Sequence, residues 1–121
     1  MKNNFHNKEI GKYGENIACK YLEKNGYNIL CRNFNTNNSE IDIIAKDKDG
    51  IIFIEVKSRT SKQYGAPIES VNEFKKKHII SAAKYYIYKN SLENKNIRFD
   101  IIEIYINEKE NLINHIKNVF F

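Results

Sequence analysis

The sequence predicts an α/β fold: a mixed sheet flanked by helices, with the element order αβββαβ. Two observations carry this prediction. Apolar residues recur with helical spacing near the N-terminus and again after residue 73, and four apolar runs with the length of strands lie between and after these segments. Because the second helix separates the third and fourth runs, these two strands can pair in parallel through a crossover. Residues 1–121 are expected to form a single domain.

The first predicted helix has one apolar face. Its members recur at helical spacing and are Ile10, Gly14, Ile17, Ala18, Tyr21 and Leu22. Gly26 follows in the turn composition KNGYN and is expected to cap the C-terminus of the helix. Glu15 borders the buried face, and Gly11 and Gly14 each weaken the helix by about 1 kcal/mol relative to alanine. The two glycines indicate either a close backbone approach or a frayed helix start.

Three strands are predicted next, over residues 27–34, 40–46 and 51–59, and the turn compositions NTNNS and DKDG separate them. A loop over 64–71 precedes the second helix. This helix is expected from about Glu73 to Asn90, with Asn72 as its N-cap and with an inner face of Ile79, Ala82, Ala83 and Tyr86. The fourth strand is predicted over 97–106, and the remaining residues form a short last strand or a tail.

Charged residues interrupt two of these apolar strands. Asp42 lies in the second strand, and Glu55 and Lys57 lie in the third. Burying an unpaired charge is costly, so such residues are expected to be paired, bound to a metal or at a surface. An isolated Glu-x-Lys at a strand end is usually a solvated pair. The conjunction of an acid in each of two adjacent strands with a third acid, Glu15, on a helix flank favours a functional site.

The turn between these strands decides which side chains share a face. A four-residue loop over 47–50 places Asp42 opposite Glu55, and a two-residue turn at 49–50 places Asp42 opposite Lys57. Both loops have an even length, so both leave the three charged residues on one face, with opposed Cβ atoms about 5 Å apart. A loop of three or five residues would move Asp42 to the other face.

This set of residue types is typical of metal-dependent phosphodiester hydrolysis. Two neighbouring carboxylates repel each other, and one resists ionisation unless a cation joins them. Mg²⁺ binds through one or two carboxylates and keeps water ligands for a phosphate substrate. A lysine on the same face, Lys57, could orient an attacking water or offset the charge that develops in the transition state.

The order of these residues resembles a known nuclease signature. A helical Glu followed by Asp and by Glu-x-Lys is similar to the PD-(D/E)xK nuclease superfamily, particularly to Holliday-junction resolvases. Over about residues 9–120 the chain also resembles the YraN family of small bacterial proteins. The blocks that carry this resemblance are GKYGENIACKYLEKNGYNIL, RNFNTNNSEIDIIA, IFIEVKSR, YGAPIESV, RFDII and HIKNVF. Ser39 departs from the family, which usually has Gly before EID.

The resemblance implies a restriction-endonuclease-like αβββαβ core and a Mg²⁺- or Mn²⁺-dependent endonuclease that acts on DNA, with branched, repair or recombination intermediates as candidate substrates. Carried over position by position, it implies catalytic roles for Glu15, Asp42, Glu55 and Lys57. The three acids would be the metal ligands. A fold does not fix a function. The alternatives are a catalytically silent nucleic-acid-binding module of the same fold and a homodimer whose sheet edge pairs with a second copy.

The charge of the chain fits a polyanionic partner. The formal net charge is +5 and the pI is near 9.1. Four basic residues flank the predicted site and are expected to contact nucleic acid; they are Arg32, Arg59, Lys62 and Lys75. The segment FKKKH at 74–78 is either part of such a surface or an exposed turn. The tyrosines at 85, 86 and 88 are interpreted as helix packing rather than as a stacking platform, and His6, His78 and His115 as structural.

The remaining features indicate a cytoplasmic protein. Cys19 and Cys31 are far apart and form no CxxC, so two thiols in a reducing compartment are expected rather than a zinc site or a disulfide. The N-terminal residues include no apolar segment long enough for a signal peptide, and no stretch approaches the length of a membrane span.

Overall fold

The computed structural model describes residues 3–60, 73–107 and 109–120. This part of the chain forms two helices and five strands. In chain order they are α1 (Asn3–Lys24), β1 (Asn28–Asn35), β2 (Glu40–Lys46), β3 (Gly50–Thr60), α2 (Glu73–Lys89), β4 (Asn96–Ile106) and β5 (Leu112–Ile116).

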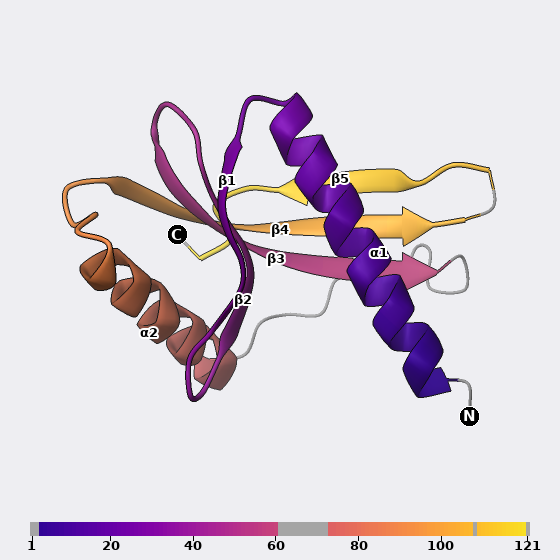
Figure 1. Ribbon diagram of the computed structural model, residues 1–121, viewed down its shortest axis with the longest axis horizontal. Helices are drawn as coiled ribbons and strands as arrows, with labels where there is room; N and C mark the ends of the chain where they lie inside the picture. Colours follow the sequence, from indigo (N-terminus) through magenta and orange to yellow (C-terminus); the bar gives the residue numbers. More distant parts are fainter. Residues whose placement is uncertain (1–2, 61–72, 108, 121) are drawn as a thin grey trace.

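The strands form one mixed sheet in the order β1-β2-β3-β4-β5. β3 and β4 are parallel, and the other neighbours are antiparallel. α2 connects the two parallel strands, as expected for a helical crossover. Figure 1 shows α1 crossing one face of the sheet, with α2 set to the other side. The structure thus confirms the α/β class and the predicted αβββαβ order, and β5 is a strand rather than a tail.

Each face of the sheet carries its own apolar layer. On the α1 side, Ala18 and Leu22 pack with strand residues that include Ile43, Ile52, Ile54, Ile102 and Ile104. On the α2 side, Ile79, Ala83 and Tyr86 pack with Ile44, Phe53 and Phe99. β3 supplies alternate residues to the two layers, which explains why its first half is apolar on both faces.

Two glycines of the N-terminal region have identifiable roles. Gly26 has φ 91°, and the amides of Gly26 and Tyr27 bond back to the carbonyls of Glu23 and Leu22 at 3.2 and 2.9 Å. This is the Schellman geometry that a C-terminal glycine permits, and it confirms the predicted cap. Gly14 is buried, and a Cβ atom there would overlap the Ser58 side chain, whereas one at Gly11 would meet nothing within 4 Å. The close approach therefore occurs at Gly14 alone.

The ends of β1, β3, α2 and β4 differ from the predicted ones by one residue, and the start of α1 differs from the frayed start that was one of the alternatives. α1 begins at Asn3, so both glycines lie inside the helix rather than in a frayed first turn. α2 has the predicted start and the predicted inner face. The expected N-cap Asn72 and the expected loop over 64–71 lie outside the described residues.

Candidate functional site

The candidate site forms where β2 separates from β3. The two strands pair from Lys46↔Ile51 to Ile43↔Ile54, which is the register of the four-residue loop. At the next residue of β2, backbone pairing with β3 has ended. There the Asp42 side chain bonds β3 instead, since its Oδ2 accepts a hydrogen bond of 2.8 Å from the amide of Val56. β2 keeps its pairing with β1 up to Asn35↔Glu40. Asp42 is thus held at the fork between two diverging strands.

The fork is an unfavourable place for a negative charge. Burial is the main cause that raises the pKa of Asp42, from an ordinary 3.8 to about 6. The hydrogen bond from Val56 opposes this rise, and the nearby carboxylates of Glu55, Glu15 and Glu40 add to it. The site therefore concentrates acids around a partly buried carboxyl group that is reluctant to ionise, a situation that a bound cation would relieve.

Glu55 lies across the fork and binds two lysines. Its Oε2 is 3.2 Å from Lys57 Nζ and 3.1 Å from Lys75 Nζ. Lys57 comes from β3, two residues on, and its side chain is 16% exposed; Lys75 comes from the first turn of α2 and is 48% exposed. By strand alternation, Glu55 and Lys57 face the α2 side, since the residue before each of them, Ile54 and Val56 respectively, packs on the α1 side.

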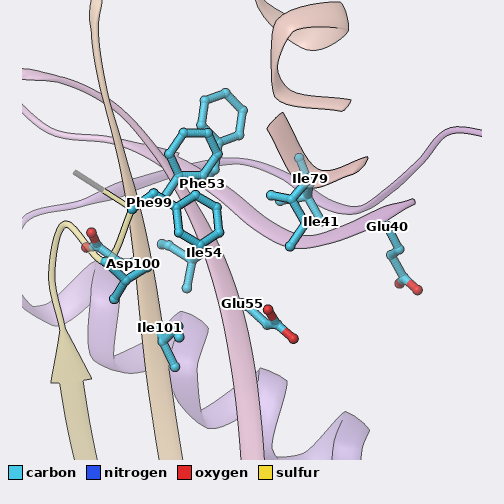
Figure 2. A pocket seen from close by; sticks show the side chains of 11 residues that line it. Glu40, Ile41, Phe53, Ile54, Glu55, Ile79, Phe99, Asp100 and Ile101 are labelled. Atoms are coloured by element: carbon cyan, nitrogen blue, oxygen red, sulfur yellow. The ribbon is translucent and has the colours of Figure 1, made fainter. Parts of the chain in front are cut away.

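Asp42 and Glu55 open into the same cleft, which has a volume of about 540 Å³. Its lining comes from the β1–β2 turn, the start of β2, β3 and the first turns of α2; the residues are Asn38, Ser39, Glu40, Asp42, Glu55, Phe74, Lys75, His78 and Ile79. A smaller apolar pocket lies beside it, and Figure 2 shows Glu55 and Glu40 on one side of it and Phe53 and Phe99 on the other. The two predicted carboxylates are therefore brought together at an accessible surface.

The third predicted acid is only a neighbour of this pair. Glu15 is on α1, the helix on the opposite face, although it is near enough to raise the pKa of Asp42. Its Oε1 accepts hydrogen bonds from Arg32 at 2.9 Å and from Asn33 at 3.1 Å. Arg32 also donates to the Asn16 side chain at 2.7 Å. The predicted nucleic-acid contact Arg32 thus neutralises Glu15, with its side chain still 37% exposed.

Of the other predicted nucleic-acid contacts, Arg59 is buried and Lys75 lies at the cleft. Arg59 is buried, and its Nε is 3.3 Å from Oε2 of Glu103, a carboxylate that is itself 1% exposed and also bonds Tyr105 and Asn114. This burial is typical of a structural ion pair, and Arg59 is therefore not part of an exposed basic surface at the cleft. Lys75 is at the cleft, and Lys62 lies outside the described residues.

The cleft offers carboxylate oxygens as donors for a metal ion. Within residues 3–60, 73–107 and 109–120, no three His, Cys, Asp or Glu side chains are gathered as a metal site. Two carboxylates are nevertheless sufficient for Mg²⁺, which keeps several waters. Val56 bonds one Asp42 oxygen and the two lysines meet one Glu55 oxygen, so the described residues leave Asp42 Oδ1 and Glu55 Oε1 for a cation. Asp42 and Glu55 fit this group, with Glu15 outside it.

Sequence reasoning missed two members of the cleft. Glu40 contributes to the acidic field at Asp42, and His78 lines the cleft while its ring meets Phe74 edge-on at 4.3 Å. The lack of ligand spacing between His78 and the other histidines predicts a structural role, and the cleft position was not predicted. The sequence position of His78, one helical turn after Phe74 and Lys75, could have predicted that it shares their helix face, since residues at i and i+4 lie on one face.

A family model and individual relatives both assign the chain to the same protein family. The model of "Uncharacterised protein family UPF0102" matches residues 14–104, a span that contains all four predicted catalytic positions. The chain belongs to the UPF0102 family. This is the YraN family whose sequence blocks the chain resembles. The match runs from the close approach at Gly14 to the end of the buried part of β4.

Relatives in this family resemble the chain over almost its whole length. A UPF0102 protein of Clostridioides difficile (strain 630) is 53% identical over 115 residues, which cover 95% of this chain and 99% of the relative. One of Clostridium acetobutylicum is 52% identical over 116 residues, with 94% and 95% covered. One of Caldicellulosiruptor bescii is 47% identical over 116 residues, with 93% and 98% covered. In the part of the chain described here, neither helix is both long and apolar enough to span a membrane.

Proposed function

We propose that this UPF0102 protein is a metal-dependent endonuclease that hydrolyses phosphodiester bonds in DNA. The observation that carries the proposal is the meeting of Asp42 and Glu55 in one cleft, with Lys57 and Lys75 on the second carboxylate. A purely structural ion pair does not require a second, partly buried carboxyl group whose pKa is raised to about 6. Clustered acids repel a polyanion such as DNA unless a bound cation lies between the carboxylates and the phosphate.

Each residue of the site has a role that follows from its place. Asp42 and Glu55 would hold a Mg²⁺ or Mn²⁺ ion, which when bound supplies a Lewis acid and an activated water. Lys57 is fixed beside Glu55 with little exposure, where it orients water or offsets charge that grows on phosphate oxygens. Lys75 is more exposed and at the rim, where it attracts and positions the backbone of the substrate.

A second function is favoured by a different observation. Glu15 is neutralised by Arg32, Glu55 is neutralised by two lysines, and the described residues gather no set of three metal-binding side chains. A site whose charges satisfy one another in this way suits a binding module of the same fold that holds nucleic acid without cutting it. This alternative predicts binding that is indifferent to divalent cations.

The test is a cleavage assay on labelled linear, single-stranded, flapped and branched DNAs, in Mg²⁺, in Mn²⁺ and in EDTA. Wild type is compared with Glu55→Gln and with Glu93→Gln, a matched change at an exposed glutamate far from the cleft. We expect wild type and Glu93→Gln to cut at least one substrate in either metal, and Glu55→Gln to be inactive. Cleavage that persists in Glu55→Gln, or binding without cleavage of any substrate, would contradict the proposal.

A further inference from the structure

A second hollow continues the cleft along α2. It has a volume of about 490 Å³ and lies between the β1–β2 turn and the middle of the helix. Asn38 and His78 line both hollows, so the two form one groove that begins at Asp42 and Glu55. Figure 1 shows the β1–β2 turn beside the first turns of α2. We call this continuous surface the α2 groove. We propose that it holds an unpaired nucleic-acid strand and leads it to the acid pair.

One face of α2 forms the long side of the α2 groove. Phe74, His78, Ser81 and Tyr85 line it, at positions i, i+4, i+7 and i+11 of the helix. These positions span roughly 16 Å along the helix axis. Bases of one strand are about 3.4 Å apart when stacked, so this length corresponds to about five nucleotides.

Two aromatic rings on this face are exposed although each is held by a neighbour. Phe74 is 73% exposed and meets the His78 ring edge-on, and Tyr85 is 51% exposed and stacks with Phe34 at 6.2 Å between ring centroids. Tyr86, in contrast, is buried as predicted for helix packing, whereas that prediction is wrong for Tyr85 and for Tyr88, which is 75% exposed. Fixed and exposed rings are the feature on which the bases of a single strand stack.

The charge around the α2 groove complements a phosphate backbone. α2 carries five lysines and one glutamate. Lys75 lies at the end of the groove that contains the acids, and Lys89 Nζ lies 5.9 Å from the centroid of the Tyr85 ring at the other end. Cations beside stacking rings are the usual combination in proteins that bind single strands.

The opposite wall favours an unpaired strand over a duplex. It is built from Asn35, Thr36, Asn37 and Asn38, whose amide and hydroxyl groups both donate and accept hydrogen bonds. Such groups match the edges of bases, which a single strand presents freely. In a duplex the faces of the bases are stacked and cannot reach Phe74 or Tyr85. The inference rests on the proposed function only in the statement that the strand is led to the acid pair for cleavage. Binding of the strand in the α2 groove does not require cleavage.

The test measures fluorescence anisotropy of a labelled dT 12-mer, in EDTA so that cleavage plays no part. A 12-base-pair duplex, an rU 12-mer and unlabelled polyglutamate as a competitor are the comparison arms. We expect the single strands to bind at least about 10-fold more tightly than the duplex. Polyglutamate should compete poorly, and the ratio of dT to rU affinity identifies the sugar that is preferred. Equal binding of duplex and single strand, or efficient competition by polyglutamate, would overturn the proposal.

Variants locate the strand on the protein. Phe74→Ala and Tyr85→Leu should each weaken dT binding about 10-fold, which is the usual effect of losing one stacking ring. Tyr88→Leu is the matched control, because Tyr88 is on the same helix and 75% exposed but does not line the α2 groove. Phe74→Ala removes so exposed a ring that the fold should be unaffected, so it decides the test if Tyr85→Leu is unstable. Equal losses at positions 74, 85 and 88 would contradict the assignment.

The two proposals fail separately. Tight, ring-dependent binding of dT by a protein that cuts nothing would overturn the nuclease and leave the α2 groove standing. Metal-dependent cleavage by a protein whose affinity is unchanged in Phe74→Ala and Tyr85→Leu would do the opposite.

Discussion

At the scale of single residues, the site depends on unequal roles for chemically similar groups. Lys57 and Lys75 bind the same oxygen of Glu55, yet the first is mostly buried and the second is half exposed. Asp42 and Glu55 are both carboxylates, but Val56 ties one to the backbone while lysines surround the other. In the proposed nuclease, environment rather than residue type would therefore separate the groups that act on chemistry from those that position the substrate.

The two lysines should give opposite kinetic effects. Lys57→Ala is expected to reduce turnover about 10²–10³-fold with a small loss of DNA affinity, because its charge acts mainly in the transition state. Lys75→Ala should instead weaken binding and reduce the slope of log affinity against log salt by about one, as for the loss of one phosphate contact. Single-turnover rates and salt-dependent affinities check both. A wild-type cleavage rate in Lys57→Ala would show the mechanism to be wrong.

Asp42→Asn should stabilise the metal-free protein. The pKa of Asp42 is raised in the folded state, so its ionisation lowers stability progressively as pH rises from about 4 to about 6. Removing the charge should recover at most about 3 kcal/mol above pH 6 and almost nothing at pH 4. Urea unfolding in EDTA at pH 4 and pH 7 measures the difference. A variant that is less stable than wild type at both pH values would mark Asp42 as a structural residue.

At the scale of elements, the contact between α1 and β3 brings the third acid towards the site. Gly14 allows the helix to approach Ser58, and Glu15 is the next residue along the chain. The Ser58 hydroxyl is buried and, within the described residues, makes no hydrogen bond. The close approach therefore costs some stability in β3 while it fixes Glu15 beside Arg32 and near Asp42.

Gly14→Ala and Gly11→Ala form a matched pair for this contact. Both changes raise helix propensity by about 1 kcal/mol. At Gly11 nothing opposes the gain, whereas at Gly14 the new Cβ overlaps Ser58 and contacts Ile104. We expect Gly11→Ala to stabilise the protein and Gly14→Ala to destabilise it by about 1–3 kcal/mol. Urea midpoints of both variants, and of Gly14→Ala with Ser58→Ala as a partial rescue, check this. Equal stabilisation by both alanines would contradict the close approach.

At the scale of the whole molecule, a buried polar network ties β5, the C-terminal segment and the residue after the α1 cap to β4. Asp100 on β4 accepts hydrogen bonds from Arg98 at 2.9 and 2.8 Å and from the Asn118 amide at 3.0 Å, and it is 2.7 Å from His115 on β5. Arg98 also reaches the Tyr27 hydroxyl at 3.0 Å, beyond α1. Figure 2 shows the Asp100 carboxylate pointing away from the pocket beside Glu55.

This network predicts acid sensitivity away from the candidate site. Burial acts to raise the pKa of Asp100, but the hydrogen bonds from His115, Arg98 and Asn118 outweigh it and lower the pKa to about 2. The network therefore contributes stability above about pH 4 that is lost as pH falls towards 2. Asp100→Asn should cost about 3–5 kcal/mol at pH 7, because Arg98 is left without its counter-charge. Asp49→Asn, in an exposed turn, is the control in urea unfolding, and a loss below 1 kcal/mol for Asp100→Asn would contradict this account.

Sequence patterns predicted the features that follow from the regular spacing of side chains along helices and strands. The even loop after Lys46 sets the register that leads Asp42 towards Glu55, and both residues line one cleft. The binding of Glu15 by Arg32 and the burial of Arg59 against Glu103 were not predictable. These pairs join elements that are distant in the sequence, and no periodicity encodes them. The homodimer stays a prediction, with the outer strands β1 and β5 as its candidate edges.

The central claim is that Asp42 and Glu55 act together on one divalent cation. The most direct measurement is Mn²⁺ binding at pH 7, followed by electron paramagnetic resonance of the free ion, in wild type, Asp42→Asn, Glu55→Gln and Glu93→Gln. We predict one Mn²⁺ per chain in wild type and Glu93→Gln, and a loss of at least about 10-fold in affinity in each of the two site variants. Unchanged Mn²⁺ binding in both Asp42→Asn and Glu55→Gln would contradict the claim.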